Sequence, residues 1–162
     1  MPKIIVLAHN IRSTHNIGAL FRTAEGSGVE QIILSGYSPC PTVEHDTRLP
    51  HIREKLTNAI HKTALGAEML VPFRYEPTPP IERLKQQGYR VVALEQAPHS
   101  IKLGHYRAPD KVALLIGEEV HGIEPELLSQ CDDIVEIAMH GKKESFNVSV
   151  AAGMALYELL LR

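Results

Sequence analysis

The sequence predicts an α/β fold class, with a mostly parallel sheet and helices on both of its faces. Apolar runs of strand length alternate along the chain with segments of helical periodicity, which is typical of parallel strands joined by helical crossovers. Residues 4–8 and 112–116 are apolar at every position, as expected of strands buried on both faces. Glycines and prolines separate the segments, and no internal repeat interrupts them.

The first half of the chain supplies three strands and three helices. In order they are strand 4–8, a helix with its apolar face at residues 17, 20, 21 and 24, strand 29–34, helix 53–65, strand 69–74 and helix 81–87. Gly26 and Gly28 follow the first of these helices and Gly88 follows the last, as is common after helix C-termini.

The second half contains strand 90–95, an irregular stretch 97–110, strand 112–116, a short helix, strand 134–139 and an apolar helix from residue 148 to the end. Polar loops at residues 117–122 and 140–147 stand where a strand gives way to a helix, which is where open α/β sheets build ligand sites. Glu119 lies between two glycines of the first loop, and Ser145 and Asn147 lie in the second. A plain structural turn remains an alternative for either loop taken alone.

Length and composition describe an ordinary globular protein. With 162 residues, 44% hydrophobic and 22% charged, we expect a single domain spanning residues 1–162. The net charge of −2 disfavours a general nucleic-acid coat protein but allows a local basic patch. No signal peptide precedes the first strand, and no apolar run reaches the ~18 residues of a membrane helix. Cys40 and Cys131 lack metal-ligand spacing, so we expect reduced thiols in a cytoplasmic protein.

Two common kinds of site find no support in the sequence. No G-x-G-x-x-G motif follows the first strand, which disfavours a nucleotide-dependent enzyme of the usual Rossmann type. The nine histidines form no H-x-x-x-H or H-E-x-x-H pattern, so we expect no metal site.

Three blocks of the chain resemble the motifs of one family, in that family's order. Residues 117–123 (GEEVHGI) resemble the G-x-E-x-x-G-[ILV] loop of the SpoU (TrmH-like) branch of the SPOUT RNA methyltransferases. Residues 137–141 (IAMHG) and 145–151 (SFNVSVA) resemble its I-P-M-x-G and S-L-N-V-S-V-A signature, and residues 10–24 resemble its N-x-R-S-x-x-N-x-G-A-x-x-R-T-A motif. Glu118, Ala138 and Phe146 depart from the usual asparagine, proline and leucine, and none of these departures removes a polar group that the chemistry needs.

This resemblance implies an enzyme that transfers a methyl group from S-adenosyl-L-methionine to a ribose 2′-hydroxyl of RNA, without a metal. It also implies a C-terminal deep trefoil knot that forms the cofactor pocket, whereas physical reasoning alone favours an unknotted sheet. The residues that would hold the cofactor are Leu94, Glu95, Gly117, Glu119, Gly122, Ile137, Met139, Ser145, Phe146 and Asn147.

The catalytic residues implied by motif position are Arg22, Asn16, Glu119, Ser145 and Asn147. In this family, proposals for how the 2′-hydroxyl is activated focus on the arginine at the motif position of Arg22. A guanidinium has a pKa above ~12 and is a poor base, so a bidentate hold on an RNA phosphate is physically easier.

The expected partners are an RNA substrate and a second copy of the chain. We favour tRNA over rRNA because the domain is minimal, with no RNA-binding extension of the kind that larger relatives add. We also expect a homodimer through the first and last helices, in which Arg22 serves the partner's cofactor site. Basic residues that could face RNA are Arg12, Arg48, Arg53, Lys142 and Lys143. The main alternative is a catalytically inactive RNA- or cofactor-binding module of the same fold.

Overall fold

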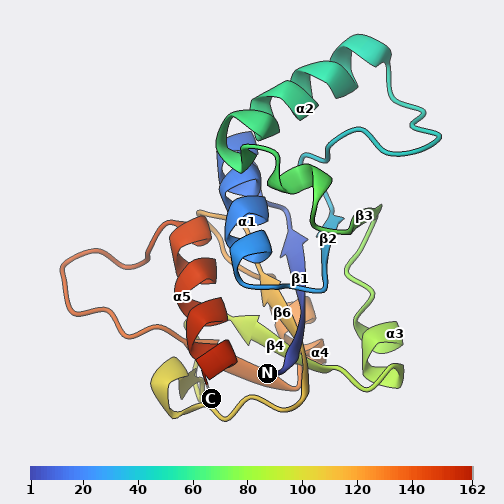
Figure 1. Ribbon diagram of the computed structural model, residues 1–162. Helices are drawn as coiled ribbons and strands as arrows, with labels where there is room; N and C mark the ends of the chain where they lie inside the picture. The colour runs from blue at the N-terminus through green and yellow to red at the C-terminus, as the bar shows by residue number, and fades with distance from the viewer. Residues whose placement is uncertain (162) are drawn as a thin grey trace.

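The computed structural model describes residues 1–161, and these form one seven-stranded sheet in which every pairing between strands is parallel (Figure 1). Across the sheet the order is β3 (Phe73–Glu76), β2 (Gln31–Ser35), β1 (Lys3–His9), β6 (Lys111–Ile116), β4 (Arg90–Leu94), β7 (Asp133–Glu136) and β5 (Ile101–Lys102). The predicted α/β class with a parallel sheet is thereby confirmed. No helix within residues 1–161 has both the length and the apolar character needed to cross a bilayer.

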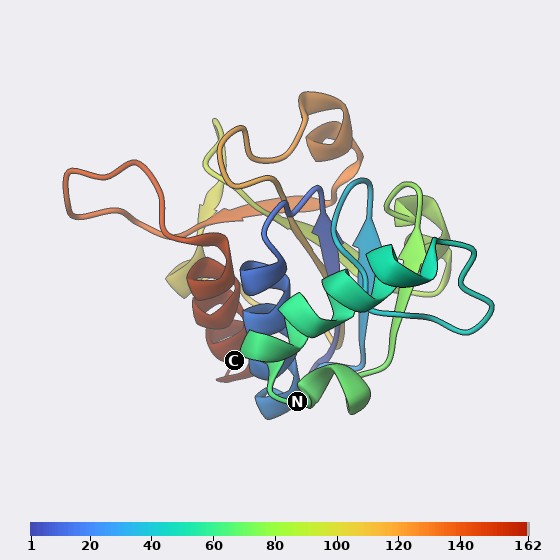
Figure 2. The same ribbon diagram turned by 90° about the horizontal axis from the view of Figure 1, so that it is seen from above.

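Helices cover both faces of this sheet, as predicted. The helical elements are α1 (Thr14–Gly26), α2 (Pro50–Ala64), α3 (Ile81–Gln86), α4 (Pro125–Gln130), α5 (Val148–Leu161) and the 3-10 helices η1 (Ala67–Met69) and η2 (Leu103–His105). In Figure 2, α1, α2 and α5 lie on one side of the sheet, whereas α3 and α4 lie on the other. Each side has its own cluster of buried apolar side chains.

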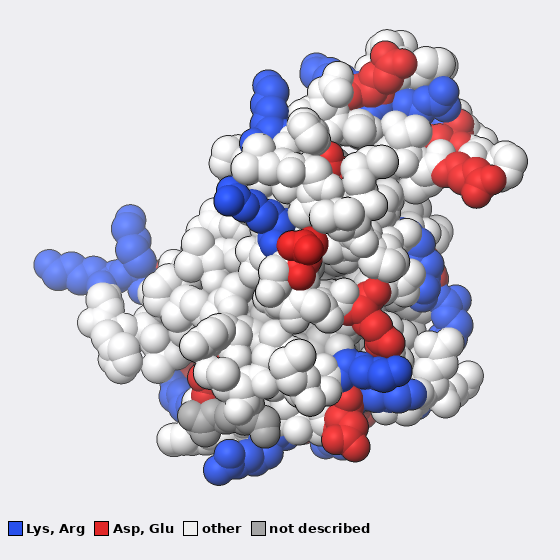
Figure 3. All heavy atoms as spheres, viewed as in Figure 1, with Lys and Arg blue, Asp and Glu red and all other residues white. Residues whose placement is uncertain are grey.

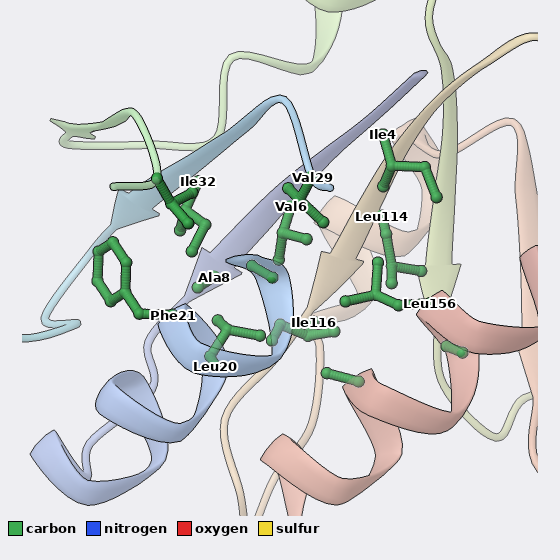
Figure 4. Packing of buried hydrophobic residues seen from close by; sticks show 14 of the residues in the cluster. Ile4, Val6, Ala8, Leu20, Phe21, Val29, Ile32, Leu114, Ile116 and Leu156 are labelled. Atoms are coloured by element: carbon green, nitrogen blue, oxygen red, sulfur yellow. The ribbon is translucent and has the colours of Figure 1, made fainter. Parts of the chain in front are cut away.

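The central strand β1 contributes to both clusters. Ile4, Val6 and Ala8 belong to the cluster under α1 and α5, while Ile5 and Leu7 belong to the opposite one. Successive side chains of a strand point to opposite faces, so a continuous apolar run buries both. Figure 4 shows Val6, Ala8 and Leu114 of the sheet beside Leu20 and Phe21 of α1 and Leu156 of α5. Burying a side chain of this size contributes roughly 1.5–3 kcal/mol, which favours the central position of β1 and β6.

Helix α1 begins at a capped N-terminus directly after the polar segment that follows β1. The Ser13 side chain accepts a hydrogen bond from the Asn16 amide nitrogen at 3.1 Å. The apolar face of the helix is buried as the sequence predicts. Gly18 allows α1 to approach α2 closely, because a Cβ atom there would lie 2.3 Å from the Ile60 carbonyl oxygen.

Several element boundaries differ from those predicted. The last strand ends at Glu136 instead of residue 139, because its neighbour β5 pairs only with Val135 and Glu136. The third strand begins at Phe73, and Met69 lies in η1, where its amide donates to the Gly66 carbonyl. Helix α2 starts at Pro50, three residues before its predicted start, and the stretch expected to be irregular contains β5 and η2.

Helix α5 has two apolar faces. In this helix, which we expected at the dimer interface, four apolar residues lie in the chain's own core: Ala152, Ala155, Leu156 and Leu159. A different set of large apolar side chains is exposed along the helix at Val150, Met154, Tyr157 and Leu161. Their spacing of four, three and four residues places them in one stripe, which we call the α5 stripe. Figure 3 shows few charged side chains over this part of the surface.

Candidate active site

A cavity of about 200 Å³ opens at the ends of three strands of the sheet. Strand β4 lies between β6 and β7, so the loops that follow these strands meet at the same edge. The cavity is lined by residues 94–96, 116–122, 136, 137, 139, 145 and 146, and by Val148 and Ala151 of α5.

Nine of the ten residues predicted to hold a cofactor line this cavity: Leu94, Glu95, Gly117, Glu119, Gly122, Ile137, Met139, Ser145 and Phe146. Asn147 does not line it, and is instead part of the hydrogen-bonded cluster described below. The cavity is also lined by Glu118, Val120 and His121, which belong to the predicted loop at residues 117–122, and by Gln96 and Glu136. The order of the strands brings these residues to one edge of the sheet.

Two glycines let the loop after β6 fold back on itself. A Cβ atom on Gly117 would lie 2.7 Å from the carbonyl carbon of Gly122. Gly122 has a φ of 70°, and its Cβ would lie 2.1 Å from Glu95 Oε2, which accepts a hydrogen bond from the Ile123 amide at 3.0 Å. We expected these glycines to let the main chain approach a cofactor closely. The atoms that come close to them are instead those of the loop itself, at Gly117, and of the Glu95 side chain, at Gly122.

Glu119 is the centre of a hydrogen-bonded cluster that joins all three sequence blocks. Its Oε1 accepts from the Asn16 side-chain nitrogen at 3.2 Å and from the Ser13 amide at 3.4 Å, and its Oε2 accepts from the Arg12 amide at 3.2 Å. The Asn147 side-chain nitrogen donates to Asn16 Oδ1 at 3.2 Å. We call Asn16, Glu119 and Asn147 the polar cluster.

Asn147 also begins the last helix. Its side-chain oxygen accepts from the Ser149 amide at 3.0 Å and from the Val150 amide at 3.4 Å. These bonds satisfy amide groups that the first turn of a helix leaves free. The same side chain thus fixes the start of α5 and orients Asn16.

Beside the polar cluster, Glu118 and Arg12 form an ion pair that the sequence did not reveal. Arg12 Nε lies 3.3 Å from Glu118 Oε1, and the Glu118 side chain is 5% exposed. The hydrogen bond from the His121 amide is the main reason why the pKa of Glu118 is lowered. The pKa of Arg12 is raised, first by a hydrogen bond with the Tyr37 side chain and then by Glu118. Glu118, which replaces the asparagine frequent at this motif position, therefore has an ionic partner.

His9, at the end of β1, lies behind the same edge of the sheet. Its buried ring places Nδ1 2.9 Å from Ser35 Oγ and Nε2 3.9 Å from Glu124 Oε1. Burial lowers the pKa of His9, and Glu124 partly opposes this shift. We expect His9 to be neutral in the folded protein near neutral pH.

Arg22 stands apart from the polar cluster within one chain. It is exposed, it does not line the cavity, and its side chain has no hydrogen bond or ion pair within residues 1–161. Arg22 comes six positions after Asn16 in the helix, which places it about 9 Å further along the axis and turns it about 120° away. Ser145 lines the cavity but also has no side-chain hydrogen bond in the described part of the chain. The structure therefore brings Asn16, Glu119 and Asn147 together, but not Arg22.

The SpoU rRNA Methylase family model matches residues 3–157 of this sequence. The chain belongs to the SpoU family. A tRNA (guanosine(18)-2′-O)-methyltransferase from Aquifex aeolicus is 29% identical over 158 residues, which are 96% of this chain and 67% of that protein. A 23S rRNA (guanosine-2′-O-)-methyltransferase RlmB from Neisseria meningitidis is 31% identical over 160 residues, 97% of this chain and 58% of that protein. The chain thus spans roughly two thirds or less of the length of these relatives.

Solved structures of SpoU relatives share the fold. An AdoMet-bound rRNA methyltransferase from Sinorhizobium meliloti superposes with a TM-score of 0.79 at 24% identity, covering 97% of this chain and 55% of that one. A TrmH/SpoU tRNA-modifying enzyme from A. aeolicus gives a TM-score of 0.79 at 24% identity, covering 99% of this chain and 75% of that one. The resemblance seen in the sequence motifs is therefore confirmed at the level of family and fold.

The basic residues considered for RNA contact differ in their surroundings in this SpoU chain. Arg48 is engaged with Asp46 at 2.6 Å, and Arg53 donates to the Asp46 carbonyl oxygen at 2.8 Å, so both hold a loop in place. Lys142 and Lys143 are exposed in the loop between β7 and α5. This loop projects at the left of Figure 1, where Figure 3 shows basic side chains extending from the surface. Within residues 1–161, no three histidine, cysteine or acidic side chains gather as a metal site would require.

Proposed function

We propose that this SpoU-family protein transfers a methyl group from S-adenosyl-L-methionine to a ribose 2′-hydroxyl of RNA. The observation that carries the proposal is the polar cluster, which ties the three motif blocks together beside a cavity at the ends of parallel strands. Membership of the SpoU family and the two relatives named as RNA 2′-O-methyltransferases give further support.

The lining of the cavity suits this cofactor. Leu94, Ile137 and Met139 offer apolar contacts for a purine ring, and main-chain groups of residues 116–122 offer hydrogen bonds for its polar edges. At about 200 Å³ the cavity is smaller than the ~300–1,000 Å³ of typical ligand pockets. We therefore expect the exposed loop at residues 140–146 to move outward when the cofactor binds.

The bound cofactor would supply an electrophilic methyl group on a sulfonium sulfur. The methyl group would pass from the sulfur to the ribose oxygen, with S-adenosylhomocysteine as the leaving group, and the hydroxyl proton would pass to water. The chain's own contribution is to hold the ribose oxygen in line and to assist the loss of its proton. We assign the positioning of the ribose to Asn16, Glu119 and Asn147, with Ser145 at the cavity rim, and the hold on the adjacent phosphate to Arg22.

Arg22 reaches a cofactor site only if a second subunit provides that site. We propose a homodimer in which the α5 stripe lies at the interface, because Val150, Met154, Tyr157 and Leu161 are 40–67% exposed along one line of the helix. Helix α1, which carries Arg22, packs directly against α5. A dimer through α5 would therefore bring Arg22 near the partner's surface.

The proposed activity is tested by methyl transfer from labelled S-adenosylmethionine to total RNA, with nuclease digestion to identify 2′-O-methylated nucleosides. We expect Arg22→Ala to retain binding of S-adenosylhomocysteine in calorimetry but to lose methyl transfer. A wild-type protein that binds both cofactor and RNA without any transfer would favour the inactive binding module instead.

The shared site is tested with purified heterodimers of Arg22→Ala and Asn147→Ala subunits, each inactive as a homodimer. If sites are shared, one of the two sites in the heterodimer holds both intact residues, and about half of the wild-type activity returns. If Arg22 serves its own chain, every site has one defect and the heterodimer is inactive. A monomer in light scattering at micromolar concentration would exclude the dimer itself.

The finer features are also part of this proposal. We favour tRNA as the substrate, although relatives that act on tRNA and on rRNA are similar to this chain to nearly the same degree. We place the protein in the cytoplasm and assign residues 1–162 to one methyltransferase domain.

We further propose that residues after β7 are threaded through a loop as a trefoil knot, and the match to the SpoU family supports this. The knot is testable by pulling the chain ends apart in optical tweezers. A knotted chain reaches a contour length shorter than the ~3.3–3.6 Å per residue of a fully extended one.

A further inference from the structure

A second and larger cavity lies beside the candidate active site. Its volume is about 560 Å³, within the range of small-molecule and nucleotide sites, and its walls come from residues 36–48, from α2 and from β3. Two tyrosines line it, Tyr37 after β2 and Tyr75 near the end of β3, and they are 53% and 46% exposed. Because β2 and β3 are parallel to β6, this cavity opens at the same edge of the sheet as the active-site cavity.

The wall of this cavity is held in place by its own hydrogen bonds. Arg48 donates to the Cys40 carbonyl oxygen at 2.9 Å and to the Pro41 carbonyl oxygen at 3.1 Å, and it pairs with Asp46. The Asp46 side chain is 4% exposed, and its hydrogen bond with Arg48 holds its pKa well below the ordinary range. A loop fixed in this way forms a preorganised site, and a ligand would lose little free energy in ordering it.

Tyr75 is also oriented. Its hydroxyl donates to the Gly36 carbonyl oxygen at 2.7 Å, so the ring is fixed against the start of the loop. The Tyr37 amide donates to Asn10 Oδ1 at 3.1 Å, which ties the other tyrosine to the first motif block. The Tyr75 ring is thus held through its hydroxyl and the Tyr37 side chain through its hydrogen bond with Arg12, and both side chains remain exposed.

Arg12 connects this cavity with the polar cluster. Its side chain is 65% exposed and lines the second cavity, while its Nε pairs with Glu118, which lines the first. Its backbone amide donates to Glu119. A guanidinium has five N–H donors, so Arg12 retains donors for a phosphate after pairing with Glu118 and with the Tyr37 side chain.

We propose that the second cavity is a stacking subsite for an unpaired base of the RNA substrate, next to the nucleotide that is methylated. Tyr37 and Tyr75 provide aromatic surfaces for the base, and Arg12 contacts the phosphate between the two nucleotides. RNA-binding proteins recognise unpaired bases by stacking them on aromatic side chains, and this stacking tolerates any base. The inference rests on the proposed function, since an RNA strand at the polar cluster is what brings a neighbouring base to Arg12. It implies that the target nucleotide lies in a loop or another single-stranded region.

The test uses a random pool of single-stranded hexaribonucleotides that contain 4-thiouridine, with S-adenosylhomocysteine present. After irradiation, cross-linked peptides are identified by mass spectrometry, and affinity is measured by fluorescence anisotropy. We expect cross-links in the peptides that contain Tyr37 or Tyr75. Loss of one stacked base costs about 1–3 kcal/mol, so Tyr37→Ala should weaken binding by roughly 5- to 150-fold, whereas the matched variant Tyr37→Phe keeps the ring and should bind within a factor of a few of wild type.

Calorimetry with S-adenosylhomocysteine separates this inference from the proposed function. Tyr37→Ala should bind that compound as wild type does, because Tyr37 does not line the first cavity. If the wild-type protein stacks the RNA base but transfers no methyl group, the proposed activity is wrong and the subsite is supported. Three results would overturn the subsite: no binding of the pool by wild type, equal binding by Tyr37→Ala and wild type, or cross-links confined to other peptides. Binding of free nucleosides with the same affinity as the pool would also overturn it, since it would indicate a small-molecule site.

Discussion

Replacing Glu119 by glutamine should destabilise the junction between the first motif block and the cofactor loops. The Glu119 carboxylate accepts three hydrogen bonds, from the Arg12 and Ser13 amides and from the Asn16 side chain, at 3.2–3.4 Å. A glutamine has one oxygen and one NH₂ group in place of the two oxygens. Whichever way it turns, its NH₂ group faces at least one N–H donor, so at least one bond is lost.

The structure sets the size of this effect. A buried donor that loses its acceptor costs about 1–3 kcal/mol, and bonds to a charged acceptor lie toward the upper end. Glu119 is half-buried, so water can replace part of the lost interaction and we expect about 1–2 kcal/mol. For a domain of this length each kcal/mol lowers Tm by about 2–4 °C, which gives a decrease of roughly 2–8 °C.

Differential scanning calorimetry measures this decrease, with Glu126→Gln as the matched control. Glu126 is exposed on α4 and its side chain has no partner within residues 1–161, so its replacement should leave Tm unchanged. A double-mutant cycle with Asn16→Ala should show coupling, because these two side chains share a hydrogen bond. If Glu119→Gln has the same Tm as Glu126→Gln, or if the effects of Glu119→Gln and Asn16→Ala on stability simply add, the polar cluster does not stabilise the protein as we argue.

Three further predictions concern glycines and a buried histidine. Gly117→Val should abolish binding of S-adenosylhomocysteine in calorimetry, because a Cβ there meets loop backbone at 2.7 Å, whereas Gly104→Val, with open space around it, should bind normally. Gly18→Ala should lower stability by about 1–3 kcal/mol or more in urea unfolding, since its Cβ would lie 2.3 Å from an α2 carbonyl oxygen, and Gly26→Ala in the same helix should not. His9 has a folded pKa below 6.5, so the unfolded chain binds more protons and the free energy of unfolding falls as the pH drops below 6.5. In His9→Gln the free energy of unfolding should fall less steeply between about pH 7 and about pH 5 than in wild type. Parallel curves for the variant and wild type would contradict this assignment.

The sequence by itself determined the fold class, most of the elements and the family. Continuous apolar runs such as residues 4–8 specify strands buried on both faces, and the spacing of Ile17, Leu20 and Phe21 specifies a buried helix face. These patterns are local, because they depend on how the side chains of neighbouring residues point. The motif blocks, also local, were sufficient to indicate the family and seven residues of the cavity wall, and the resemblance implied Leu94 and Glu95 as well.

Only the tertiary structure decided which of these residues meet. Glu119 contacts Asn16 across 103 residues and Asn147 contacts Asn16 across 131 residues, and these contacts depend on the order of strands in the sheet. The same is true of the Arg12–Glu118 pair and of the distance between Arg22 and the polar cluster. A chain's local pattern constrains each strand and helix separately, whereas their arrangement follows from packing both faces of one sheet. For this reason the residues of the site could be named from the sequence, but not their partners.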